Sequence, residues 1–151
     1  MDEPSYSERA IAARREFAAH SSAIGISDAF IDQLVETFYG RIRADTTLGP
    51  IFEAAIEDRW PAHLAKMKDF WGAIAFVDGR YSGKPMPAHA KLLPGLEPAH
   101  FAIWLRLFGT AVEETAPTPE AAAFFLERSK RIAESLKLGL FYRPDQVVPK
   151  G

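Results

Sequence analysis

The chain has no cysteine among its 151 residues, which excludes disulfide bonds, thiolate metal sites and iron–sulfur clusters. It also lacks long apolar runs. The longest, residues 71–77, is far too short to span a membrane. The first 25 residues carry four acidic side chains and no apolar segment, so they do not form a secretory signal. We therefore expect a cytoplasmic protein with no membrane role.

A strong charge of either sign is missing as well. The chain has 18 basic and 20 acidic residues, and its basic side chains form no patch, so we expect no nucleic-acid partner. The common nucleotide-binding, zinc-protease and serine-hydrolase motifs do not occur. Residues 79–84 resemble a phosphate loop, but the stretch is one residue short. In addition, Pro85 stands where a serine or threonine must bind magnesium.

What the sequence does contain is helical periodicity. Stretches with a 3.6-residue apolar repeat are separated by proline and glycine, and nothing alternates as a strand would. We predict helices over about 5–20, 28–44, 58–77, 88–92, 98–115 and from Pro119 onward, with residues 48–52 turning the chain. Ser27 and Thr118 are the expected caps. The prediction is an all-α domain over 26–143, with a loosely docked N-terminal helical extension over 1–25 and a tail over 144–151.

Three predicted helices place a side chain with a polar tip on an apolar face: Tyr39, His63 and Trp104. His63 shares its face with Met67, Phe70, Trp71 and Ile74. Because each of the three belongs to a different helix, they could converge on one pocket. Considered alone, each of them is more often explained by ordinary core packing.

A second histidine, His89, follows a proline-rich connector 26 residues after His63. The two imidazoles could face each other across a flat ligand such as a haem, one on the iron and the other guarding the vacant side. Without cysteine, such a haem would be held non-covalently, as haem b. His89 could also be a surface residue, and a non-haem iron site from His63, His89 and a carboxylate such as Asp69 stays open. His20 and His100 receive no function.

At these residues the chain resembles the group III (P-type) truncated haemoglobins over about 27–142. The similarity lies in a series of short motifs that occur in order. They are Phe38-Tyr39, Leu48-Gly49-Pro50-Ile51-Phe52, Trp60-x-x-His63-x-x-Lys66-Met67-x-x-Phe70-Trp71, Tyr81-x-Gly83-x-Pro85-x-x-x-His89 and Phe101-x-x-Trp104-Leu105-x-Leu107-Phe108. The Gly-Gly pairs of groups I and II are absent, as expected for group III.

The resemblance implies a two-over-two helical sandwich around a b-type haem. It assigns His89 to the iron as the proximal ligand and Tyr39, His63 and Trp104 to the distal pocket, where any chemistry would occur. Lys66, one turn after His63, could pair with a haem propionate, although a lysine at such a position is more often simply solvated. The remaining expected cofactor contacts are apolar: Phe38, Phe52, Met67, Phe70 and Trp71.

Such a pocket would bind oxygen, nitric oxide or carbon monoxide at ferrous iron. Hydrogen bonds from Tyr39 and Trp104 would stabilise oxygen there by about 1–3 kcal/mol each. Slow release favours redox chemistry on oxygen, nitric oxide, nitrite or peroxide, with an external reductase because no flavin or nicotinamide module is evident. His63 could donate a proton or act as a gate. The alternatives are an oxygen carrier, a gas sensor, or a cofactor-free helical interaction module.

Overall fold

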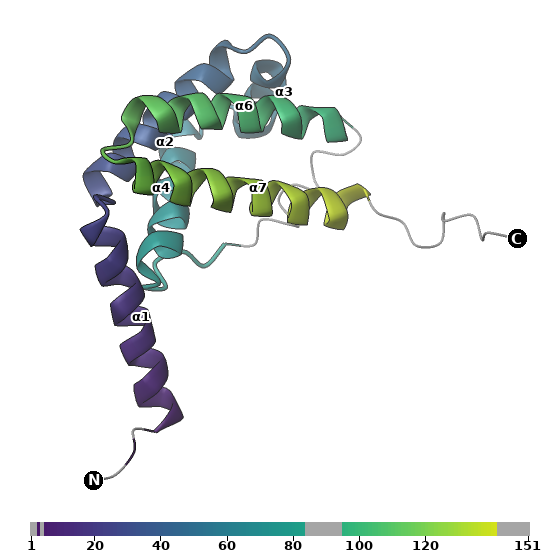
Figure 1. The fold of residues 1–151 in the computed structure, drawn as a ribbon. Coiled ribbons are helices and arrows are strands. Elements are labelled where there is room, and N and C mark those ends of the chain that lie inside the picture. The colour runs from purple at the N-terminus through teal and green to yellow at the C-terminus, as the bar shows by residue number, and fades with distance from the viewer. Residues whose placement is uncertain (1–2, 4, 84–94, 142–151) are drawn as a thin grey trace, which may run out of the picture.

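The computed structural model describes residues 3, 5–83 and 95–141, and this part of the chain contains six α-helices and no strand (Figure 1). The all-α prediction is therefore confirmed. The predicted short helix over 88–92 lies outside the described residues. The helices are α1 (Tyr6–Ala23), α2 (Asp28–Ala44), α3 (Leu48–Ile56), α4 (Trp60–Phe76), α6 (Pro98–Thr115) and α7 (Pro119–Phe141).

Four of the helices form two packed layers. Helix α2 pairs with α4, α6 pairs with α7, and α2 lies against α6 where the layers meet (Figure 1). Apolar side chains from both layers are fully buried at this junction. They include Leu34, Val35, Ile42, Phe108, Val112 and Phe125. This arrangement is the two-over-two sandwich that the sequence resemblance implied.

The predicted caps open two of these helices. The Ser27 hydroxyl accepts a hydrogen bond from the Phe30 N–H at 3.1 Å, and α2 begins at the next residue. The Thr118 hydroxyl accepts from the Ala121 N–H at 3.0 Å and donates to the Ile24 carbonyl. Thr118 thus starts α7 and also ties it to the end of α1.

The prediction of a turn over 48–52 is wrong, because these residues begin helix α3. The Asp45 carboxylate accepts from the Leu48 N–H at 2.8 Å and so satisfies a donor at the helix start. Pro50 lies in the first turn, where its missing N–H removes no helical hydrogen bond. A Cβ on Gly49 would lie 2.8 Å from the Arg43 carbonyl oxygen, so this glycine lets α3 cross closely over the end of α2.

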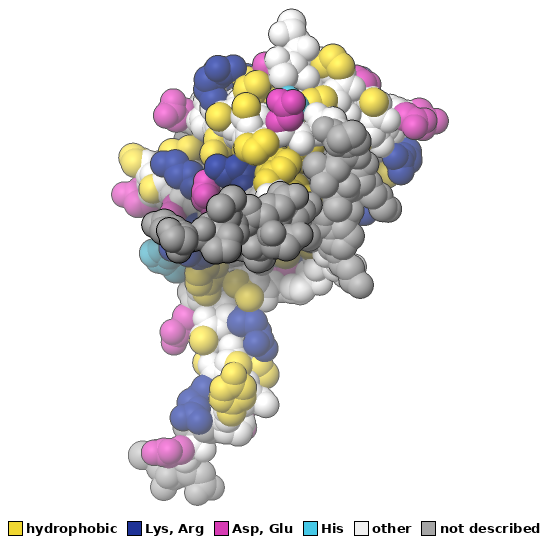
Figure 2. Space-filling view, turned by 90° about the vertical axis from the view of Figure 1, so that its right-hand side faces the viewer, with side chains coloured by type: hydrophobic (Ala, Val, Ile, Leu, Met, Phe, Trp, Pro, Cys, Tyr) yellow, Lys and Arg dark blue, Asp and Glu magenta, His cyan; other side chains and the backbone are white. Residues whose placement is uncertain are grey.

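Helix α1 is the predicted N-terminal extension, and only its second half is docked. The buried Ser21 hydroxyl donates to the Ala75 carbonyl of α4 at 2.6 Å, and the Phe17 ring lies 6.0 Å from that of Phe124. The first turns project from the body, and Figure 2 shows basic, acidic and apolar side chains mixed along this helix. Tyr6, near its start, is 81% exposed.

Candidate functional site

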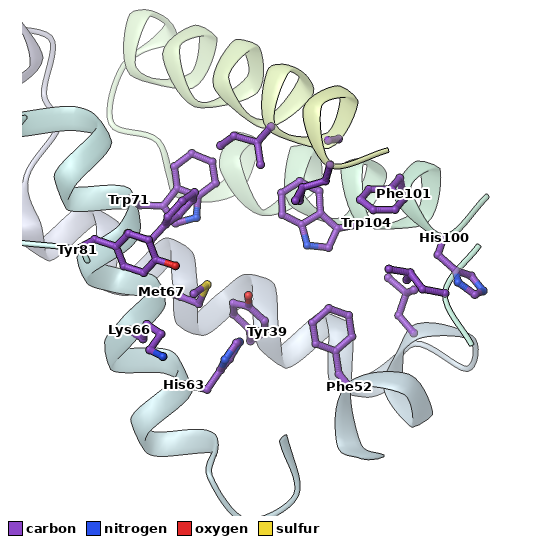
Figure 3. A pocket seen from close by; sticks show the side chains of 16 residues that line it. Tyr39, Phe52, His63, Lys66, Met67, Trp71, Tyr81, His100, Phe101 and Trp104 are labelled. Atoms are coloured by element: carbon purple, nitrogen blue, oxygen red, sulfur yellow. The ribbon is translucent and has the colours of Figure 1, made fainter. Parts of the chain in front are cut away.

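The helices around the layer junction enclose a cavity of about 250 Å³ (Figure 3). Side chains from α2, α3, α4, α6 and α7 line it, so no single helix forms the site. Eight residues predicted from the sequence meet at this cavity: Tyr39, Phe52, His63, Lys66, Met67, Phe70, Trp71 and Trp104. The convergence of three polar-tipped side chains from three helices is thus present in the folded chain.

Two predicted residues are not among those that line the cavity. Phe38 is 1% exposed and lies in the core, with ring centroids 4.9 Å from Tyr39, 5.3 Å from Trp104 and 5.1 Å from Phe108. It therefore supports two cavity residues from behind. His89, the predicted iron ligand, lies outside the described residues.

Several residues that line the cavity were not predicted from the sequence: Leu48, Tyr81, Leu96, His100, Phe101, Ile132, Ala133 and Leu136. Tyr81 and Phe101 belong to the motifs of the resemblance, and Ile132 and Leu136 lie on the apolar stripe of the last helix. These could have been assigned by extending the same reasoning. His100 could not have been assigned in this way, because it lies off the apolar stripe of its helix. Its side chain reaches the cavity from the first turn of α6.

His100 has a definite local role at the start of α6. Its Nδ1 accepts a hydrogen bond from the Glu97 N–H at 3.0 Å. An imidazole nitrogen that accepts carries no proton, so the neutral ring of His100 is protonated at Nε2. The side chain that caps this helix therefore also contributes to the cavity wall.

Tyr39 supplies a buried hydroxyl. The residue is 6% exposed, and its oxygen points into the cavity (Figure 3). Within the described part of the chain, no residue forms a hydrogen bond with this oxygen. Burial raises the pKa of the phenol well above its ordinary value, so the group stays protonated at neutral pH. Tyr39 therefore offers a donor to whatever occupies the cavity.

Trp104 of α6 faces the same space, and its plane is fixed by two other rings. The indole stacks on Phe108, with centroids 5.2 Å apart and planes 2° from parallel. It also meets Phe38 edge to face at 5.3 Å. These contacts hold the indole on the α6 side of the cavity, across from α4 (Figure 3).

Helix α4 forms a wall of mixed character. His63 is half-buried in its first turns and meets Tyr39 edge to face, with centroids 5.1 Å apart. Lys66 is exposed at the rim one turn later. Met67, Phe70 and Trp71 make the rest of this wall apolar. Within the described part of the chain, the cavity therefore has apolar sides, a few polar tips and one cation at its edge.

The residues described by the structure contain no group of three or more histidine, aspartate or glutamate side chains that could hold a metal ion. Asp69, the carboxylate considered for a non-haem iron site, is exposed. The same part of the chain has no helix that is both long and apolar enough to cross a membrane.

Comparison with known proteins gives the family. No family model matches the chain. The chain is 34% identical over 119 residues to the group 3 truncated hemoglobin ctb of Campylobacter jejuni, covering 77% of this chain and 92% of that protein. The crystal structure of group III truncated hemoglobin from Campylobacter jejuni superimposes with a TM-score of 0.72, at 34% identity and the same coverage.

The chain is a globin and belongs to the group III truncated haemoglobins, as its motifs predicted. The family implies a haem cofactor, and the chemistry of the residues that line the cavity suits one. Its apolar walls suit a flat macrocycle, and Lys66 at the rim suits acidic groups at the edge of the cofactor. The Tyr39 hydroxyl is a buried donor directed at the space that a haem and its ligand would share.

Proposed function

We propose that this chain binds haem b in the cavity and uses it to bind oxygen and other diatomic gases for redox chemistry. The observation that carries this proposal is the Tyr39 hydroxyl, which is buried, directed into the cavity and without a hydrogen-bond partner in the described part of the chain. The hydroxyl is a donor that faces the cavity, so a ligand held there can accept a hydrogen bond from it without displacing a described residue.

Haem supplies an iron that binds oxygen, nitric oxide or carbon monoxide and exchanges single electrons. The absence of cysteine supports non-covalent attachment. We propose His89 as the proximal ligand. Its support is the position of His89 in the family motif, after Tyr81 and Gly83.

Tyr39 and Trp104 act as donors to the gas ligand. Each would stabilise a partly negative ligand by about 1–3 kcal/mol, which slows its escape by roughly tenfold for every 1.4 kcal/mol. Slow escape is a disadvantage for oxygen transport and an advantage for reaction on the ligand. The protonated state of Tyr39, maintained by its burial, allows it to donate throughout the neutral pH range.

His63 and Lys66 complete the site on the α4 side. His63 contacts Tyr39, so it can deliver a proton next to the donor or swing to open the cavity. Lys66, exposed at the rim, would pair with a haem propionate. Oxidation of nitric oxide to nitrate consumes one oxygen molecule and one electron per nitric oxide. We therefore propose an external reductase as the electron source, and nitrite and peroxide as further substrates.

The test begins with an absorption spectrum of the purified protein. A strong Soret band with one haem per chain is expected. A colourless protein that takes up no added haemin would contradict the proposal. The oxygenated protein is then mixed with nitric oxide, first alone and then with a cellular reductase. We expect nitrate in one turnover and then in repeated cycles. Fast, reversible oxygen release with no turnover of nitric oxide, nitrite or peroxide would contradict the redox role.

A further inference from the structure

Trp60 lies behind the two polar residues of α4 and α2 and contacts both. Its ring centroid is 6.0 Å from that of Tyr39 and 5.9 Å from that of His63, at interplanar angles of 66° and 88°. Tyr39 and His63 also meet edge to face. The three rings therefore form a closed set, in which Tyr39 and His63 line the cavity and Trp60 does not. Trp60 is 6% exposed.

The orientation of the Trp60 indole is held from the side away from the cavity. Its Nε1 donates to Glu53 Oε2 at 3.2 Å, and Arg43 Nε donates to Glu53 Oε1 at 2.8 Å. The Arg43 guanidinium lies 4.4 Å from the centre of the Trp60 ring. Arg43, Glu53 and Trp60 come from α2, α3 and α4, so this triangle, which we call the Arg43–Glu53–Trp60 clamp, joins three helices.

Stability alone does not explain the clamp. The Arg43 and Glu53 side chains keep 48% and 43% of their surface exposed, and ion pairs as exposed as this contribute little to folding. The contacts of Arg43 and Glu53 instead restrict the orientation of the Trp60 indole. The Trp60 N–H and the Arg43 guanidinium hold the pKa of the Glu53 carboxyl below its usual value. Glu53 therefore stays charged and continues to accept the indole hydrogen bond at neutral pH.

A rotation of the indole would displace both rings that pack against it. We propose that Trp60, oriented by Glu53 and Arg43, is a positioning residue that fixes the side chains of Tyr39 and His63 at the cavity. This inference rests on the proposed function, because it concerns the residues that would face the gas ligand. It means that two exposed charged residues, Arg43 and Glu53, influence the cavity although they do not line it.

The test compares four variants of the full chain. Glu53→Ala removes the acceptor, Glu53→Gln keeps an acceptor oxygen but removes the charge, and Trp60→Phe keeps a ring but removes the N–H. Lys68→Met is the matched control. It breaks the ion pairs of Lys68 with Asp32 and Glu36, at 2.7 and 2.8 Å, which also join α4 to α2 but lie outside the cavity.

The probe is carbon monoxide on the haem-loaded protein, followed by its infrared stretching band and its dissociation rate. Glu53→Ala and Trp60→Phe should shift or split the band and change the rate about three- to tenfold, in the lower part of the range expected for residues that contact each other. Glu53→Gln should lie nearer the wild type, and Lys68→Met should match it. A wild-type band and rate in both Glu53→Ala and Trp60→Phe would overturn the inference, as would an equal shift in Lys68→Met.

A second readout does not need the cofactor. The NMR shifts of the His63 and Tyr39 ring protons depend on ring orientation, and they should differ between the wild type and Glu53→Ala. Unchanged shifts would overturn the positioning role even if the wild-type chain took up no haem. A wild type without haem would contradict the proposed function and leave this measurement as the decisive one for Trp60.

Discussion

Helices α1 and α4 have nearly the same length, 18 and 17 residues, but they are stabilised in opposite ways. Helix α1 has a complete capping box, formed by Ser5 and Glu8, and an alanine-rich sequence, yet it buries one residue, Ser21. Helix α4 has no side-chain cap hydrogen bond at its start and buries Trp60, Trp71, Gly72 and Ala75. Capping and helix propensity are thus enough to form a helix such as α1. A helix that lines a cavity, such as α4, also has to be packed against its neighbours.

The outer side of α4 shows how its position is fixed. Arg80 crosses Gly72 so closely that a Cβ there would lie 2.5 Å from its guanidinium nitrogen. From that position Arg80 pairs with Asp28 at the start of α2 and with Asp78. Arg80, which follows α4 in the chain, therefore links the two helices on this side by packing on Gly72 of α4 and pairing with Asp28 of α2. The other side of α4 lines the cavity.

The largest effect should come from His89→Gly, which removes the side chain proposed as the proximal iron ligand. Loss of the proximal ligand should remove haem during purification, and added imidazole should restore it. The measurement is the ratio of Soret to protein absorbance. A normal spectrum and stoichiometry would show that His89 is not the ligand and would make His63 the candidate.

Next in size are Tyr39→Phe and Trp104→Phe. Each should speed oxygen dissociation roughly ten- to a hundredfold, because a donor to a partly charged acceptor is lost. Stopped-flow release measures this rate. Tyr6→Phe on α1 is the matched control, since it removes the same hydroxyl from an exposed tyrosine and should change nothing. Unchanged rates in both cavity variants would rule out a polar, tight-binding pocket, and opposite effects would indicate competing donors.

A smaller effect is expected from Ser21→Ala, at the contact between α1 and α4. Ser21→Ala leaves the Ala75 carbonyl, at the end of α4, without the hydroxyl that donates to it at 2.6 Å. The cost should be about 1–3 kcal/mol, which lowers the unfolding temperature by about 2–4 °C for each kcal/mol. Calorimetry of the haem-loaded protein gives this value, with the exposed neighbour Ser22→Ala as control. Equal melting of the two variants would mean that the docked half of α1 does not stabilise α4.

The smallest effect belongs to the projecting half of α1. Tyr6→Ala should change the free energy of unfolding by less than about 0.5 kcal/mol, because the side chain is 81% exposed. Denaturant unfolding measures it. A loss comparable to that of Ser21→Ala would show that the first turns of α1 are packed in solution and would remove the contrast with α4.

Several features followed from the sequence because their causes are local. Ser27 and Thr118 mark helix starts through hydrogen bonds to residues three positions away. The 3.6-residue repeat placed Tyr39, His63 and Trp104 on inward faces, and the cavity contains all three. The turn predicted over 48–52 was wrong because Gly49 and Pro50 stand in the first turn of α3, where a proline removes no helical hydrogen bond.

Other features depended on contacts between distant parts of the chain. The place of Phe38 behind the cavity, the contribution of His100 to its wall and the clamp on Trp60 all require helices that are packed at particular distances and angles. The sequence by itself determined that the chain is helical, which side chains face inward, and that cysteine chemistry is absent. Only the tertiary structure decided which inward residues meet at the cavity and which fill the core. Periodicity specifies a direction around one helix axis, whereas a pocket depends on where several axes cross.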